Sequence, residues 1–122
     1  MLRDQVIMAT KIGVITLKAG MPTVEEARTR LKSEIDRAKK SGMVALKIIH
    51  GYGSSGVGGS LKHAVRRSLR KRVKEGRIRS FVGGEEWDIF EEHTREILEE
   101  CPELGKDRDL RGYNEGITVV LL

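Results

Sequence analysis

The chain has 122 residues, of which 34% are charged and 4% aromatic, with one cysteine and a formal net charge of +5. This length is typical of a single domain that buries roughly two-thirds of its unfolded surface, and the lone Cys101 excludes an internal disulfide. Because there is no long apolar run and no basic start followed by an apolar stretch, we expect one cytoplasmic domain over residues 1–122.

The first half of the chain predicts a strand, a helix and a second strand. Residues 13–17 are strand-like and end in a turn that contains Gly and Pro. Thr23 with Glu26 three residues later forms a capping-box pattern, and an apolar stripe then continues to about Ser41. Residues 43–49 are almost continuously apolar, which favours a central strand covered by helices. The strand–helix–strand path implies a right-handed parallel crossover.

The second half predicts a helix from Ser60 to about Glu75, a strand over residues 77–82, an acidic helix over residues 85–101 and a last strand over residues 117–122. The order is β-α-β-α-β-(α)-β. We therefore expect the α/β class, as a two-layer sandwich with a mixed four-stranded sheet. Residues 84–112 would be an acidic helical insertion before the last strand.

Charge is segregated along the chain. Residues 61–80 hold nine Lys or Arg against one Glu, whereas residues 84–103 hold nine Asp or Glu against one Arg. Helical spacing places four of the cations in one stripe: Lys62, Arg66, Arg70 and Lys74. Such a stripe can follow a sugar-phosphate backbone. The acidic segment either folds back near the stripe and weakens binding, or packs through Trp87 and Phe90 with its carboxylates in water.

A glycine-rich stretch, residues 51–59, joins the central strand to the basic helix and follows His50 directly. Free amides at a helix N-terminus attract anions, and glycine lets the backbone approach them, so a phosphate is the expected ligand. Residues 51–56 also match the G-x-G-x-x-G fingerprint of dinucleotide-binding domains. That alternative is disfavoured because the helix is expected only at Ser60, is strongly cationic, and leads to a strand without a closing acid.

Together these segments resemble the Smr (small MutS-related) domain family. The motifs that carry the resemblance are Gly20-Met21, Val24-Glu25-Glu26-Ala27, Ile48-Ile49-His50-Gly51-Tyr52-Gly53, Leu61, Ala64-Val65-Arg66-Arg67 and Asn114-Glu115-Gly116-Ile117-Thr118-Val119-Val120. The resemblance implies a fold like the C-terminal domain of translation initiation factor three. It also implies binding of branched or single-stranded nucleic acid and, for some members, nicking endonuclease activity on DNA or RNA.

The chain departs from the family at one motif. Members with nuclease activity usually carry Leu-Asp-x-His at the end of the first strand, where this sequence has Thr16 in place of Asp and Lys18 in place of His. Thr and a protonated Lys are poor metal ligands and poor proton acceptors at neutral pH. Two functions therefore stay open: a phosphodiesterase in which His50 assists proton transfer, with Mg²⁺ or Mn²⁺ recruited, and a non-catalytic nucleic-acid-binding module.

The predicted site faces DNA or RNA and no membrane. His50 is its candidate catalytic residue. The candidate phosphate-binding residues are His50, Gly51, Tyr52, Gly53, Ser54, Ser55, Gly56, Ser60, Lys62, Arg66, Arg67, Arg70 and Lys18. No metal-ligand spacing is present, because His63, His93 and Cys101 are isolated in the sequence, and we expect no resident metal.

Overall fold

The computed structural model describes residues 12–20, 22–51 and 57–122. The elements, in chain order, are β1 (Ile12–Thr16), α2 (Val24–Lys40), β2 (Ala45–Ile49), α3 (Val57–Lys74), β3 (Ser80–Gly83), the 3₁₀ turn η1 (Gly84–Glu86), α4 (Glu92–Glu100), the 3₁₀ turn η2 (Pro102–Lys106) and β4 (Ile117–Leu121). The four strands form one sheet in the order β1-β2-β4-β3. β1 and β2 are parallel, and β4 is antiparallel to both of its neighbours. The predicted α/β class and mixed sheet are confirmed.

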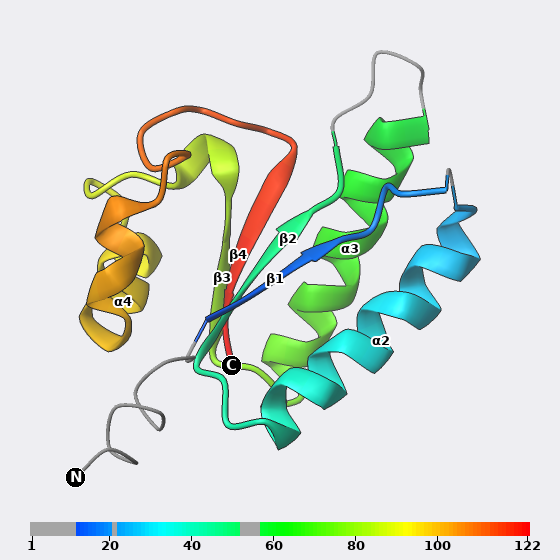
Figure 1. Ribbon diagram of the computed structural model, residues 1–122, viewed down its shortest axis with the longest axis horizontal. Helices are drawn as coiled ribbons and strands as arrows, with labels where there is room; N and C mark the ends of the chain where they lie inside the picture. Colours follow the sequence, from blue (N-terminus) through cyan, green and yellow to red (C-terminus); the bar gives the residue numbers. More distant parts are fainter. Residues whose placement is uncertain (1–11, 21, 52–56) are drawn as a thin grey trace, which may run out of the picture.

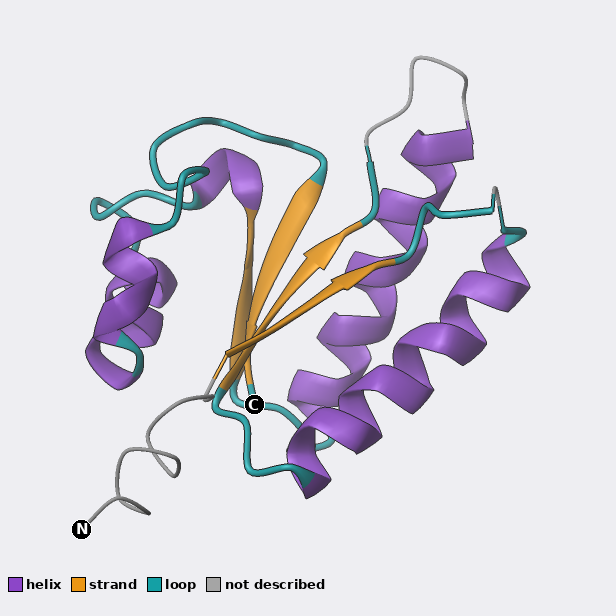
Figure 2. Cartoon of the chain, in the orientation of Figure 1, coloured by secondary structure: helices purple, strands orange, loops and turns teal. Residues whose placement is uncertain are grey.

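Helices cover both faces of this sheet (Figure 1). α2 and α3 lie side by side over one face, where Leu46, Ile48 and Val120 join the apolar side chains of the two helices in a first core. α4 and η2 lie on the other face, as the colouring by secondary structure shows (Figure 2). There Trp87 and Ile97 pack in a second core. The acidic segment thus adds a short helical layer to the expected sandwich.

Local sequence signals place the first crossover as predicted. The Thr23 side chain accepts a hydrogen bond from the Glu26 amide, and the Glu26 carboxylate accepts one from the Thr23 amide, so the capping box is formed. Gly42, which follows the C-cap residue Ser41, has a φ of 76°, the left-handed conformation that ends many helices. The apolar central strand β2 is then buried between β1 and β4.

Three predicted elements differ from the structure, of which one is β3, which begins at Ser80 and not at the predicted residue 77. α3 begins at Val57, three residues before the predicted start at Ser60, so part of the glycine-rich stretch belongs to the helix. The predicted continuous helix over residues 85–101 is wrong, because η1 and a turn precede a short α4. Phe90 lies in that turn and is 85% exposed, whereas Trp87 is buried. An apolar pattern with helical spacing therefore did not require a helix here.

None of the described helices combines the length and the apolar character that crossing a bilayer requires.

Candidate nucleic-acid interface

His50 is a buried side chain whose two ring nitrogens are both engaged. It follows β2 directly, is 0% exposed, and its backbone amide donates to the Gly116 carbonyl at 2.9 Å. Nδ1 lies 2.7 Å from the Gly51 carbonyl oxygen, and Nε2 lies 2.9 Å from Oγ1 of Thr118. Since a carbonyl can only accept, Nδ1 carries the proton and Nε2 accepts from the Thr118 hydroxyl. The ring thereby connects β2 to β4.

The same chain of hydrogen bonds continues to the basic helix. Thr118 Oγ1 accepts a hydrogen bond from Nε of Arg66 at 3.1 Å, while its own proton points to His50. Burial lowers the pKa of His50 to about 4, the nearby positive charges of Arg66 and Lys62 act in the same direction, and the hydrogen bond to Gly51 opposes them. The imidazole is therefore neutral at pH 7. Catalysis by His50 stays a prediction that would require these contacts to break.

Arg66 is held by the carboxylate that follows β3. Its Nη1 and Nη2 donate to the two oxygens of Glu85 at 2.7 and 2.8 Å, a bidentate pair in which the Arg66 side chain is 13% exposed. Burial raises the pKa of Glu85, but the hydrogen bonds from Arg66 and the backbone, together with the positive charges of Arg66 and Lys62, outweigh burial and lower that pKa. Lys62 donates to Glu115 at 2.8 Å and lies 3.9 Å from Glu85. Two of the four predicted stripe cations are thus paired within the protein.

The remaining cations of α3 form an exposed face. Arg67, Arg70, Lys71 and Lys74 share one side of the helix and are all exposed. Within the part of the chain that the structure describes, no carboxylate pairs with any of these four residues. The predicted stripe therefore divides into a paired N-terminal half and an exposed C-terminal half. We call the four exposed residues Arg67, Arg70, Lys71 and Lys74 the cationic face.

A groove of about 580 Å³ lies between this cationic face and the edge strand β3. All four cations of the face line it, together with Arg79, whose Nη1 donates to an exposed carboxylate of Glu100 at 3.0 Å. Two apolar side chains also line it: Val73, which is 37% exposed, and the partly buried Phe81. No carboxylate is among its described lining residues. We call this hollow the β3-edge groove.

A second hollow, of about 540 Å³, lies at the carboxyl ends of the parallel strands β1 and β2. Lys18, Gly51, Asp109, Tyr113 and Asn114 line it. Lys18 and Thr16 are both exposed, so the positions where the family motif has His and Asp are accessible. A Cβ atom at Gly51, which has a φ of 76°, would lie 3.4 Å from the Lys18 side chain. The predicted residues Lys18 and Gly51 are therefore neighbours.

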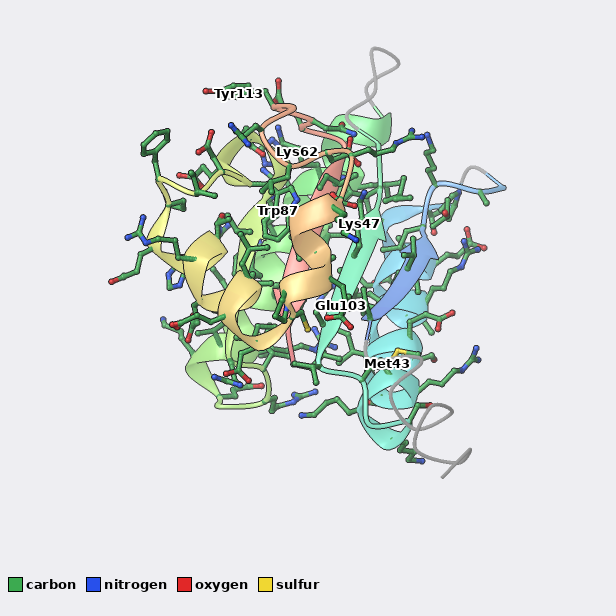
Figure 3. The ribbon with its side chains drawn as sticks, turned by 60° about the vertical axis from the view of Figure 1, so that its left-hand side comes forward. Met43, Lys47, Lys62, Trp87, Glu103 and Tyr113 are labelled. Atoms are coloured by element: carbon green, nitrogen blue, oxygen red, sulfur yellow. The ribbon has the colours of Figure 1, made fainter. Side chains whose placement is uncertain are left out.

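A buried ion cluster fixes the loop that forms this second hollow. Nζ of Lys47 donates to Asp107 at 2.8 Å and to Asp109 at 2.6 Å, although Lys47 sits in the apolar strand β2. Trp87 Nε1 also donates to Asp107, and Figure 3 shows Trp87 and Lys47 on the two sides of the orange helical turn η2, which precedes Asp107. Burial lowers the pKa of Lys47, but the hydrogen bonds and negative charges of the two carboxylates together outweigh burial and raise that pKa. For Asp109, the hydrogen bonds from Lys47 and Asn114 and the nearby positive charges together outweigh burial and lower the pKa.

Several predicted site residues lie outside the described residues: Tyr52, Gly53, Ser54, Ser55 and Gly56. Ser60 is exposed within α3. The expected helix start at Ser60 was one argument against a dinucleotide-binding site. That argument is wrong, because α3 begins at Val57, directly after Gly56. The cationic character of α3 still disfavours a dinucleotide-binding site. Sequence reasoning missed Thr118 and Lys47. Each is a single polar residue in an otherwise apolar strand, a signal that could have identified both as members of buried polar networks.

The sequence profile of the Smr domain family matches residues 19–88, which is more than half of the chain. This chain belongs to the Smr domain family. Among solved structures it is similar to the Smr domain of Thermus thermophilus MutS2, with a TM-score of 0.56, 23% sequence identity, and coverage of 90% of this chain and 96% of that one. At that identity the likeness shows a shared fold. The comparison with curated proteins gave no match.

Proposed function

We propose that this Smr domain binds nucleic acid through the cationic face of α3 and does so without cleaving it. The observation that supports this most directly is the set of four exposed cations that no described carboxylate neutralises. Like charges crowded on two helical turns repel one another unless an anion compensates them. A phosphate backbone supplies such anions at regular spacing, and binding releases its counterions.

The paired cations have a different role in this proposal. Arg66 and Lys62 are committed to Glu85 and Glu115, so they hold the end of α3 against η1 and the start of β4. His50 and Thr118 continue that network inside the sheet. We infer that His50 acts in positioning, by fixing the backbone at Gly51 where the glycine-rich stretch begins. The amides of that stretch stay predicted phosphate ligands.

A salt titration with matched charge variants tests the proposal. Arg70→Gln with Lys74→Gln removes two positive charges from the cationic face, and Lys40→Gln with Lys106→Gln removes two exposed positive charges elsewhere. For single-stranded DNA and RNA, we expect the first pair to reduce the slope of log K against log salt by about one to two. The control pair should leave the slope nearly unchanged. Equal slopes for both double variants would refute the proposed surface.

Nicking is the second candidate function, and the hollow at the carboxyl ends of β1 and β2 favours it. Ligands of α/β sheets commonly bind outside the carboxyl ends of the strands, and Lys18 and Asn114 line this hollow. A supercoiled plasmid and a structured RNA, each with Mg²⁺ or Mn²⁺, would be incubated with the wild type and with Lys18→Ala. Cleavage that is lost in the variant would support an enzyme. Cleavage at equal rates in both would contradict a cleavage site in this hollow that depends on Lys18.

A further inference from the structure

The β3-edge groove brings together two kinds of surface that phosphate binding alone does not require. Positive charge comes from the cationic face, whereas Arg79 is paired with Glu100, and Val73 and Phe81 supply an apolar surface beside those charges. A phosphate backbone needs only the charge. We propose that the groove accommodates one unpaired base of a bound strand, with Phe81 against the base and the neighbouring cations on its flanking phosphates. This inference rests on the proposed function and adds to it a subsite for a base.

Size and chemistry both fit a base with its sugar. Pockets that take small molecules typically span about 300 to 1,000 Å³, and this groove measures about 580 Å³. Bases stack on aromatic rings and on guanidinium planes, and the groove offers one of the two phenylalanines together with Arg67, Arg70 and Arg79. Carboxylates would repel the phosphates, and the described lining residues include none.

The position of the groove determines which nucleic acids can use it. β3 is an edge strand, so the groove opens at the side of the sheet and beside the exposed cations of α3. A base inside a duplex is stacked and paired, and it can enter such a groove only after it leaves the stack. An unpaired base in a single strand, a loop or a junction needs no such step. The domain should therefore prefer nucleic acid with at least one unpaired nucleotide.

The experiment compares three oligonucleotide ligands of equal length and sequence: a single strand, the same strand with abasic sites throughout its central third, and a blunt duplex. All three are measured over the same series of salt concentrations, as DNA and as RNA where the chemistry allows. We expect the wild type to bind the intact strand about tenfold more tightly than the abasic strand, because base–aromatic stacking contributes about 1–3 kcal/mol per base. The abasic strand keeps every phosphate, so the ratio isolates the base.

Phe81→Leu keeps an apolar side chain against the first core but removes the ring. In this variant we expect the affinity for the intact strand to fall close to that for the abasic strand. The slope of log K against log salt should stay unchanged. Phe90→Leu is the matched control, because Phe90 is 85% exposed and lies outside the groove. Val73→Glu is a second variant at an exposed position in the groove, and Val14→Glu on the opposite edge strand β1 is its control.

The outcomes separate this inference from the proposed function. If the wild type binds all three ligands, and binds the intact and abasic strands equally tightly, the base site is overturned and the charged surface is left intact. Absence of binding to every ligand at low salt would overturn both. A poly-glutamate peptide that binds as tightly as the single strand, and loses binding in Val73→Glu but not in Val14→Glu, would assign the groove to an acidic protein and refute the inference.

Discussion

The stability of the domain should fall on mild acidification because His50 is buried in its neutral form. The pKa of His50 is lowered from 6.5 to about 4, so between those values the unfolded chain binds a proton that the folded domain does not. Stability is fully present above about pH 6.5 and declines as the pH falls toward 4. One pKa unit corresponds to about 1.4 kcal/mol, so the full loss approaches about 3 kcal/mol, and about 2 kcal/mol is already lost at pH 5.

Urea unfolding at pH 7, 6 and 5 measures this loss. The fluorescence of Trp87, which is the single tryptophan and is fully buried, reports the transition. His50→Gln is neutral at every pH, so its free energy of unfolding should change about 2 kcal/mol less than that of the wild type between pH 7 and 5. Carboxylates that titrate in the same range cancel in this difference. Equal losses in both proteins would refute the argument that His50 is desolvated and neutral.

Three further changes follow from single contacts. A Cβ atom at Gly84 would lie 1.8 Å from a backbone carbonyl oxygen, so Gly84→Ala should destabilise the domain by about 3 kcal/mol in urea unfolding, while Gly105→Ala, which meets nothing within 4 Å, should have little effect. Lys47→Met leaves two carboxylates without their cation and should cost about 3–5 kcal/mol in urea unfolding at pH 7. Glu85→Gln should tighten binding to single-stranded DNA at low salt because it releases its cationic partners, whereas Glu86→Gln should tighten it less; equal effects would contradict this role.

The fold was predictable because its signals are local. The capping box at Thr23, the glycine after α2 and the alternation of apolar segments each depend on a few neighbouring residues, and each is present in the structure. The acidic segment was harder to predict. Its apolar residues have helical spacing, but the chain turns after η1 so that Trp87 can enter the second core and donate to Asp107. Tertiary packing there overrides the local pattern.

The candidate site was predictable in its charge but not in its pairing. Composition located the cations of α3, because a run of Lys and Arg is visible in any sequence. Which of them are neutralised depends on contacts between residues far apart in the chain, such as Arg66 with Glu85 and Lys62 with Glu115. The β3-edge groove also depends on tertiary structure, because it forms where α3 packs beside the edge strand β3.

The acidic segment both contacts cations and contributes side chains to the second core. The sequence leaves two roles open for it: a mask over the basic stripe, and an amphipathic element with its carboxylates in water. Glu85 contacts Lys62 and Arg66, and Glu100 contacts Arg79, while Trp87 and Ile97 fill the second core. A deletion of residues 85–103 would therefore remove core side chains together with charges. Single substitutions such as Glu85→Gln separate the two contributions.

Amide chemical shifts during titration with a short single strand test the central claim most directly, because they locate the ligand on the folded domain. The account predicts that the largest changes occur on the cationic face of α3 and in β3 near Phe81, with small changes on α2 and on the exposed side of α4. Changes confined to the hollow near Lys18 and Tyr113, with α3 unaffected, would contradict it.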